Sequence, residues 1–126
     1  MDAAEIKAKY DELTQKKEGL GALLVLSKDG SILYASDPNF AKPEEAKALM
    51  DAWLTTKPAL EIGGLRYPIL KWDPLQLAAR NTAGNGAIVG SVTKAGNYAV
   101  MQLLKSCTIP LLEAGVILNR WSWSLF

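Results

Sequence analysis

Histidine is absent from this 126-residue sequence, and cysteine occurs once, as Cys107. Without histidine, the chain has no Ser-His-Asp or Cys-His nucleophile system and no histidine-ligated metal site. A single thiol completes neither a cysteine-ligated zinc site nor an internal disulfide. Catalysis by carboxylates alone stays open, but no close acidic pair adjoins an apolar, pocket-forming segment. We therefore expect a non-enzymatic protein without metal or cofactor.

Long apolar runs are also missing. No stretch approaches the roughly 20 residues that a membrane-spanning helix needs, and the charged first residues do not resemble a secretory signal. One cysteine is typical of a reducing compartment. We therefore expect a cytoplasmic protein that does not span a membrane. Its 49% hydrophobic and 21% charged residues are ordinary values for a globular protein, and the length suits one domain covering residues 1–126.

Charge is divided unevenly along the chain, although the net charge is only +1. Residues 1–62 contain 8 basic and 11 acidic residues, and residues 63–126 contain 6 and 2. This asymmetry favours a mildly basic surface in the second half. The alternative, that helices simply carry more charge than strands, stays open. No dense basic run is present, which argues against a nucleic-acid partner.

Hydrophobic periodicity predicts a helix, a hairpin and a second helix in the first half. The first helix covers residues 3–17, the hairpin pairs strands 22–26 and 31–36 around Lys28-Asp29-Gly30, and the second helix runs from Pro43 to Lys57-Pro58. Proline at the first helical position, followed by two glutamates, is a typical helix start.

The second half predicts an antiparallel meander followed by a helix. The strands cover residues 60–62, 65–71, 75–80, 86–93 and 97–104, separated by turns rich in Gly, Pro, Asn and Asp. Thr108 is the expected cap of a last helix over 109–118, with Pro110 in its first turn. That helix is apolar on almost every side, so we expect it to pack on more than one side. The predicted fold class is α+β, a central antiparallel sheet with helices on its faces.

Several short motifs, in order, resemble those of profilins, the small actin-monomer-binding proteins. They are Tyr10-Asp11-Glu12-Leu13, Lys28-Asp29-Gly30-Ser31, Lys42-Pro43-Glu44-Glu45, Gly63-Gly64-Leu65-Arg66-Tyr67, Gly84-x-Gly86 and Val92-Thr93-Lys94-Ala95-Gly96. The resemblance implies a sheet with both terminal helices on one face and smaller helical elements on the other. It also implies a monomer that regulates actin polymerisation in the cytoskeleton. The stretch from Leu24 to Ser36 alone would also suit a roadblock/longin-like dimeric adaptor for a small GTPase.

The resemblance implies that an actin-binding surface includes basic side chains of the second half. Its members are Arg66, Lys71 and Arg80, with Val89 and Lys105 as further candidates. From the residues alone, solvated charges at a strand edge are the commoner interpretation. Arg66 and Lys71 are five residues apart, so on an unbroken strand they would point to opposite faces. For both to meet one partner, the strand must bulge or end before Lys71.

Two further activities of the family are weaker predictions here. Proline-rich segments would stack on the aromatic residues Tyr10, Trp121, Trp123 and Phe126 of the terminal helices. However, Lys7 and Leu33 stand where the family pattern has tryptophan, so we expect this binding to be weak or lost. The alternative use of these rings is packing of the chain ends. Phosphoinositides would use Arg66, Lys71 and Arg80, but we rank them below actin because no dense basic cluster is present.

Overall fold

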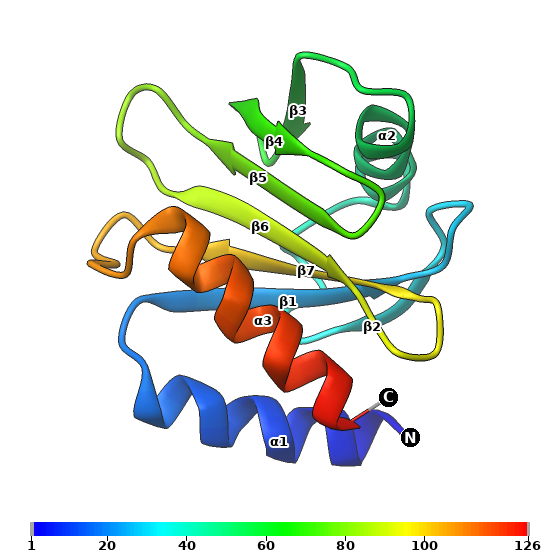
Figure 1. Ribbon diagram of the computed structural model, residues 1–126, viewed down its shortest axis with the longest axis vertical. Helices are drawn as coiled ribbons and strands as arrows, with labels where there is room; N and C mark the ends of the chain where they lie inside the picture. Colours follow the sequence, from blue (N-terminus) through cyan, green and yellow to red (C-terminus); the bar gives the residue numbers. More distant parts are fainter. Residues whose placement is uncertain (1, 126) are drawn as a thin grey trace.

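A seven-stranded antiparallel sheet forms the centre of the molecule in a computed structural model that describes residues 2–125 (Figure 1). The strand order is β2-β1-β7-β6-β5-β4-β3. The elements are α1 (Ala3–Lys16), β1 (Leu20–Leu26), β2 (Ile32–Ala35), α2 (Pro43–Leu54), β3 (Ala59–Ile62), β4 (Leu65–Trp72), β5 (Gln76–Arg80), β6 (Ala87–Val92), β7 (Tyr98–Leu103) and α3 (Leu111–Leu125). The predicted α+β class and antiparallel sheet are confirmed.

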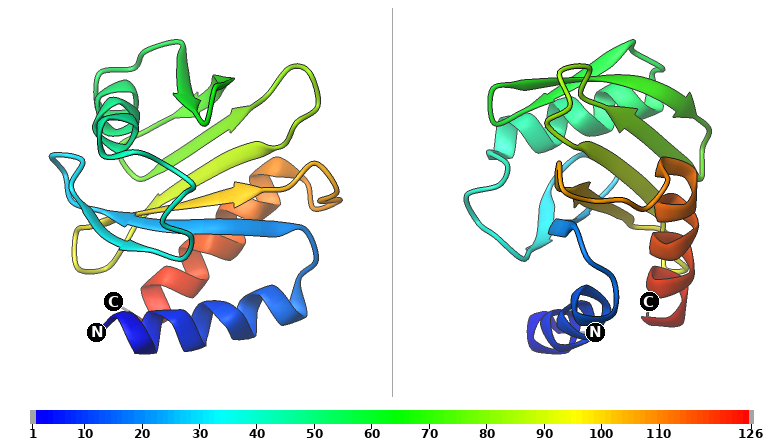
Figure 2. Two further views of the ribbon diagram at one scale, coloured as in Figure 1. Left: turned by 180° about the vertical axis from the view of Figure 1, so that it is seen from behind. Right: turned by 90° about the vertical axis from the view of Figure 1, so that its left-hand side faces the viewer.

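The terminal helices α1 and α3 share one face of the sheet, and α2 covers the other (Figure 2). On the first face, Val89 and Met101 from the central strands pack with Ile6 of α1 and with Ala114 and Leu118 of α3. This is the arrangement that the resemblance to profilins implied. Because α3 packs on β5, β6 and β7, the strands β4 and β3 extend beyond it on this face.

On the opposite face, Trp53 fixes α2 to the sheet. Its indole N–H donates to the carbonyl oxygen of Asp73 at 2.9 Å, and its ring meets the ring of Tyr98 edge-on with centroids 5.1 Å apart. The ring lies against the backbone of Gly90, where an added Cβ would come within 2.8 Å of it. A glycine is therefore needed at this point of β6 so that α2 can pack closely.

Helix α3 differs from the prediction at both ends. The N–H of Ala114 donates to the carbonyl oxygen of Pro110, so Pro110 occupies the cap position, and the expectation for Thr108 is wrong. The helix also continues to Leu125 rather than ending near residue 118. It packs on two sides as expected, against the sheet and, through Trp121, against Tyr10 of α1.

Candidate functional site

Strand register places Lys71 and Arg80 on the same face of the sheet. Lys71 lies opposite Ala78, and Arg80 lies opposite Ala87. Residues directly opposite each other in an antiparallel pair point to the same side. Because both alanines belong to the core beneath α1 and α3, the two cations point to the face that carries these helices.

Arg66 and Lys71 lie on the same face of the sheet because β4 has a bulge between them. Tyr67 and Ile69 point into the core beneath α2, so Arg66 leaves β4 on the α3 face. It also lines a cavity of about 490 Å³ beside β3 and α2. The register then shifts between Ile69 and Lys71, which brings Lys71 to the face that Arg66 occupies. The bulge that the sequence required for a shared surface is therefore present.

The three cations differ in how they are held. Arg66 and Arg80 are exposed, and neither guanidinium makes a hydrogen bond or ion pair with another residue of the range 2–125. The Nζ atom of Lys71 donates to Oε1 of Gln76 at 3.1 Å and lies 3.9 Å from Oδ2 of Asp73. Two of the charges are thus available to a partner without breaking an existing contact.

An exposed apolar stripe on α3 lies beside these cations. Leu112, Val116 and Trp123 are 63%, 42% and 48% exposed, and their spacing of four and seven residues puts them on one side of the helix. Trp123 donates its indole N–H to the carbonyl oxygen of Val92 at 2.8 Å, at the end of β6. Trp121 lies on the other side of α3, against α1. The stripe, which we call the α3 flank, therefore faces away from α1 and toward the strands that carry the cations.

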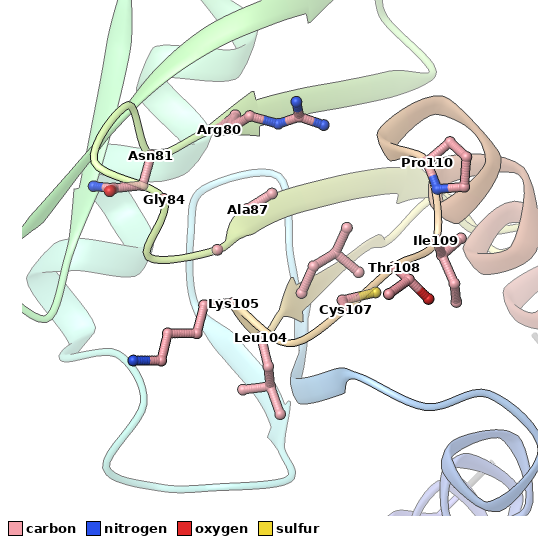
Figure 3. Close-up of a pocket in the computed structure, with 12 residues that line it drawn as sticks. Arg80, Asn81, Gly84, Ala87, Leu104, Lys105, Cys107, Thr108, Ile109 and Pro110 are labelled. Carbon is pink, nitrogen blue, oxygen red and sulfur yellow. The ribbon is translucent and has the colours of Figure 1, made fainter.

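The two lesser candidates have different positions. Val89 is completely buried beneath α3, so it does not reach the surface, and the expectation that it contacts a partner is wrong. It is buried because β6 is a central strand that α3 covers. Lys105 is exposed at a cavity of about 310 Å³ between the β5–β6 turn and the loop before α3. Arg80 lines the same cavity, but the two side chains extend in different directions (Figure 3).

The three described residues proposed for proline-rich ligands, Tyr10, Trp121 and Trp123, are not gathered in one site. Tyr10 is buried, and its hydroxyl donates to the carbonyl oxygen of Gly21 at 2.7 Å. Burial, with a smaller contribution from Tyr34, raises the pKa of Tyr10 far above its usual value. Trp121 packs edge-on against it with ring centroids 5.5 Å apart. Trp123 lies on the opposite side of α3, so among the predicted rings that the structure describes, Tyr10 and Trp121 meet and Trp123 does not join them.

Phe126, the fourth predicted ring, lies outside the described residues. The two positions where the family pattern has tryptophan carry no ring in this chain. Leu33 is exposed on the edge strand β2, and Lys7 is exposed and forms an ion pair with Asp11. The pair that does meet, Tyr10 and Trp121, joins α1 to α3, which agrees with the alternative of terminal packing.

The sequence interpretation missed the α3 flank. Its signal was available, because apolar residues at positions 112, 116 and 123 continue the helical period past residue 118 on a side that lacks the core residues. The predicted helix ended at residue 118, so this regularity was not recognised. Within residues 2–125, no helix has the length and apolarity to cross a bilayer, and no cluster of three or more acidic or cysteine side chains is placed to hold a metal.

Comparison with known proteins gives a consistent result, although no protein-family model matches the chain. The curated protein Loki profilin-3 from Lokiarchaeum sp. is 41% identical over 108 residues, which are 85% of this chain and 87% of that protein. Among solved structures, LokiProfilin1 matches with a TM-score of 0.79 and 17% identity over 99% of this chain and 100% of its own.

Two other solved structures agree. LokiProfilin2, solved as a complex with rabbit actin, matches with a TM-score of 0.79 and 16% identity over 100% of both chains. The profilin of Schizosaccharomyces pombe matches with a TM-score of 0.72 and 20% identity over 94% of both chains. The structures establish a common fold, and Loki profilin-3 adds close sequence similarity over most of the length. The chain therefore belongs to the profilin family.

Proposed function

We propose that this chain binds monomeric actin with one surface and thereby limits actin polymerisation. The observation that carries the proposal is that Arg66, Lys71 and Arg80 share the face of the sheet beside the exposed α3 flank. Support also comes from LokiProfilin1 and LokiProfilin2, which have this fold and were each solved as a complex with rabbit actin. The protein acts by binding alone, as a cytoplasmic monomer of the cytoskeleton, without a catalytic step.

Cations and apolar residues have separate roles in this surface. The exposed guanidinium groups attract an acidic face of actin, which raises the association rate and fixes the orientation of the complex. The α3 flank supplies the apolar centre, where buried side chains contribute most of the affinity. Leu70 of β4 is exposed, lies between Arg66 and Lys71 along the strand, and extends the apolar area.

A monomer-sequestration assay tests the proposal. The wild-type protein is expected to slow spontaneous actin polymerisation in proportion to its concentration. Changing Arg66, Lys71 and Arg80 together to Glu is expected to abolish this effect while the circular dichroism spectrum stays unchanged. The fold should tolerate the change because Arg66 and Arg80 make no contact that the fold needs, and Lys71 is partly exposed.

The control is a second triple reversal, in which Lys28, Lys42 and Lys47 are changed to Glu. These lysines are exposed on the β1–β2 turn and around the start of α2, which covers the opposite face of the sheet. The net charge changes equally in both variants, so the control removes any general effect of charge. Equal activity of the first variant and the wild type would refute the proposed surface, and an inactive wild type would refute the function.

Proline-rich segments are expected to bind weakly or not at all. Such ligands stack on exposed aromatic faces, whereas Tyr10 is buried and bonded to the backbone of β1. Trp121 uses its edge contact with Tyr10 to join the two terminal helices, and its indole N–H donates to the carbonyl oxygen of Lys9 at 3.3 Å.

Phosphoinositide headgroups are a weaker candidate ligand for the same three cations. Arg66, Lys71 and Arg80 lie on one face, but they are fewer than the four to eight basic residues that usually mark such sites. Cosedimentation with vesicles that contain phosphoinositides would measure this binding, and loss of binding in the triple reversal would assign it to this surface. The roadblock/longin alternative is set aside because the chain belongs to the profilin family.

A further inference from the structure

The hydrogen-bond ladder between β4 and β5 does not extend as far as Arg66. The two strands are paired from Trp72 and Leu77 to Ile69 and Ala79, and over the described residues the pairing ends there. Beyond this point, Arg66 pairs with Glu61 of β3 on its other side. The segment of β4 that carries Arg66 is therefore not held to β5 by the regular backbone ladder.

The side chain of Asn81 takes the place of the missing ladder. Its Nδ2 atom donates to the carbonyl oxygen of Arg66 at 2.9 Å. Its Oδ1 atom accepts the N–H groups of Ala83 at 3.0 Å and Asn85 at 3.1 Å. The residue is only 7% exposed, and all three bonds are partly buried. One amide thus joins the β5–β6 turn to the backbone of Arg66.

We propose that Asn81 is a positioning residue for actin binding, which sets the placement of Arg66 relative to Arg80. This inference rests on the proposed function. Arg80 directly precedes Asn81, and Arg66 supplies the carbonyl that Asn81 binds. Neither guanidinium has a partner in the described chain, so no side-chain contact holds it in place. The relative position of the two arginine side chains therefore depends on the backbone to which each is attached. A preformed arrangement reduces the ordering cost of binding.

The first experiment measures actin affinity for Asn81→Ala and for Asn97→Ala. Asn97 is a suitable control because it lies in the β6–β7 turn, where its backbone N–H donates to Thr93 and its side chain makes no hydrogen bond with the described residues. We expect Asn81→Ala to weaken binding about tenfold, the size of one well-placed hydrogen bond. Asn97→Ala should bind as the wild type does.

A double-mutant cycle then separates positioning from general loss of stability. If Asn81 acts through Arg66, the effect of Asn81→Ala should fall to about twofold or less when Arg66 is already alanine. The same loss in both backgrounds would overturn the inference, since it would mean that Asn81 affects the whole domain. An Asn81→Ala variant that binds actin as tightly as the wild type would overturn it as well.

Asn81→Ser covers the case in which the alanine variant does not fold. A serine hydroxyl still accepts an N–H bond within the turn but is too short to bridge to the carbonyl of Arg66. The Asn81→Ser variant is expected to fold and to bind actin about tenfold more weakly, and retention of full actin affinity would overturn the inference. If the wild type binds and Arg66→Ala weakens binding, but neither Asn81 variant does, only this inference fails. If the wild type does not bind, the proposed function fails with it.

Discussion

Shortening Leu112 to alanine should weaken actin binding without weakening the fold. The side chain is 63% exposed on the α3 flank, so the folded domain gains little from it. In the proposed complex it would become buried at the apolar centre of the surface. The change therefore removes a contact that exists only when actin is bound.

The magnitude follows from the exposed fraction. Complete burial of a leucine side chain contributes about 1.5–3 kcal/mol. Roughly two thirds of the Leu112 side chain is still available to a partner, so the complex would lose about 1–2 kcal/mol. Since each 1.4 kcal/mol is a factor of ten in the dissociation constant, the expected loss of affinity is about 5- to 30-fold.

The same sequestration assay measures this loss, with Leu33→Ala as the matched control. Leu33 is 54% exposed and lies on β2, the strand at the edge of the sheet far from β4. The two variants remove the same atoms from similar environments in the free protein, and thermal unfolding should shift little in either. Equal actin affinity of the two variants would refute the α3 flank as part of the interface.

Two further predictions concern the pH dependence of stability and the binding of a proline-rich peptide. Hydrogen bonds from the Ser27 hydroxyl and from Ser31 lower the pKa of Asp29 from 3.8 to about 2, so its contribution to stability is complete above about pH 4 and is lost as the pH falls toward 2. Melting temperatures measured across this range should fall less steeply for Asp29→Asn, and parallel curves would contradict the assignment. Titration with a proline-rich peptide should leave the tryptophan fluorescence without a saturable change, and saturation at low micromolar peptide would contradict the expectation of weak or lost binding.

Secondary structure was predictable where local signals agree with packing. The β1–β2 hairpin follows from its Lys28-Asp29-Gly30 turn, and α2 follows from Pro43 and an apolar stripe that the structure buries. Helix α3 was placed two residues early and ended about seven too soon. Its cap residue is Pro110, whose side chain has no hydrogen-bond acceptor, so no side-chain cap marks the N-terminus. Its C-terminal turns carry Trp121 and Trp123, whose roles depend on contacts with α1 and β6.

The candidate site was predictable only in part, because it depends on facts of register. The sequence analysis required that the strand bulge or end before Lys71, but which of the two occurs depends on the pairing of β4 with β5. The exclusion of Val89 likewise required knowing that α3 crosses β6. Asn81 gave no functional signal, since asparagine before a glycine turn is ordinary turn chemistry. Its bond to Arg66 joins residues 15 apart in sequence, and only the separation of β4 from β5 makes that bond necessary. The basic residues of the proposed surface could therefore be named from the sequence. The residue that we propose to set their spacing, Asn81, could be found only from the tertiary structure.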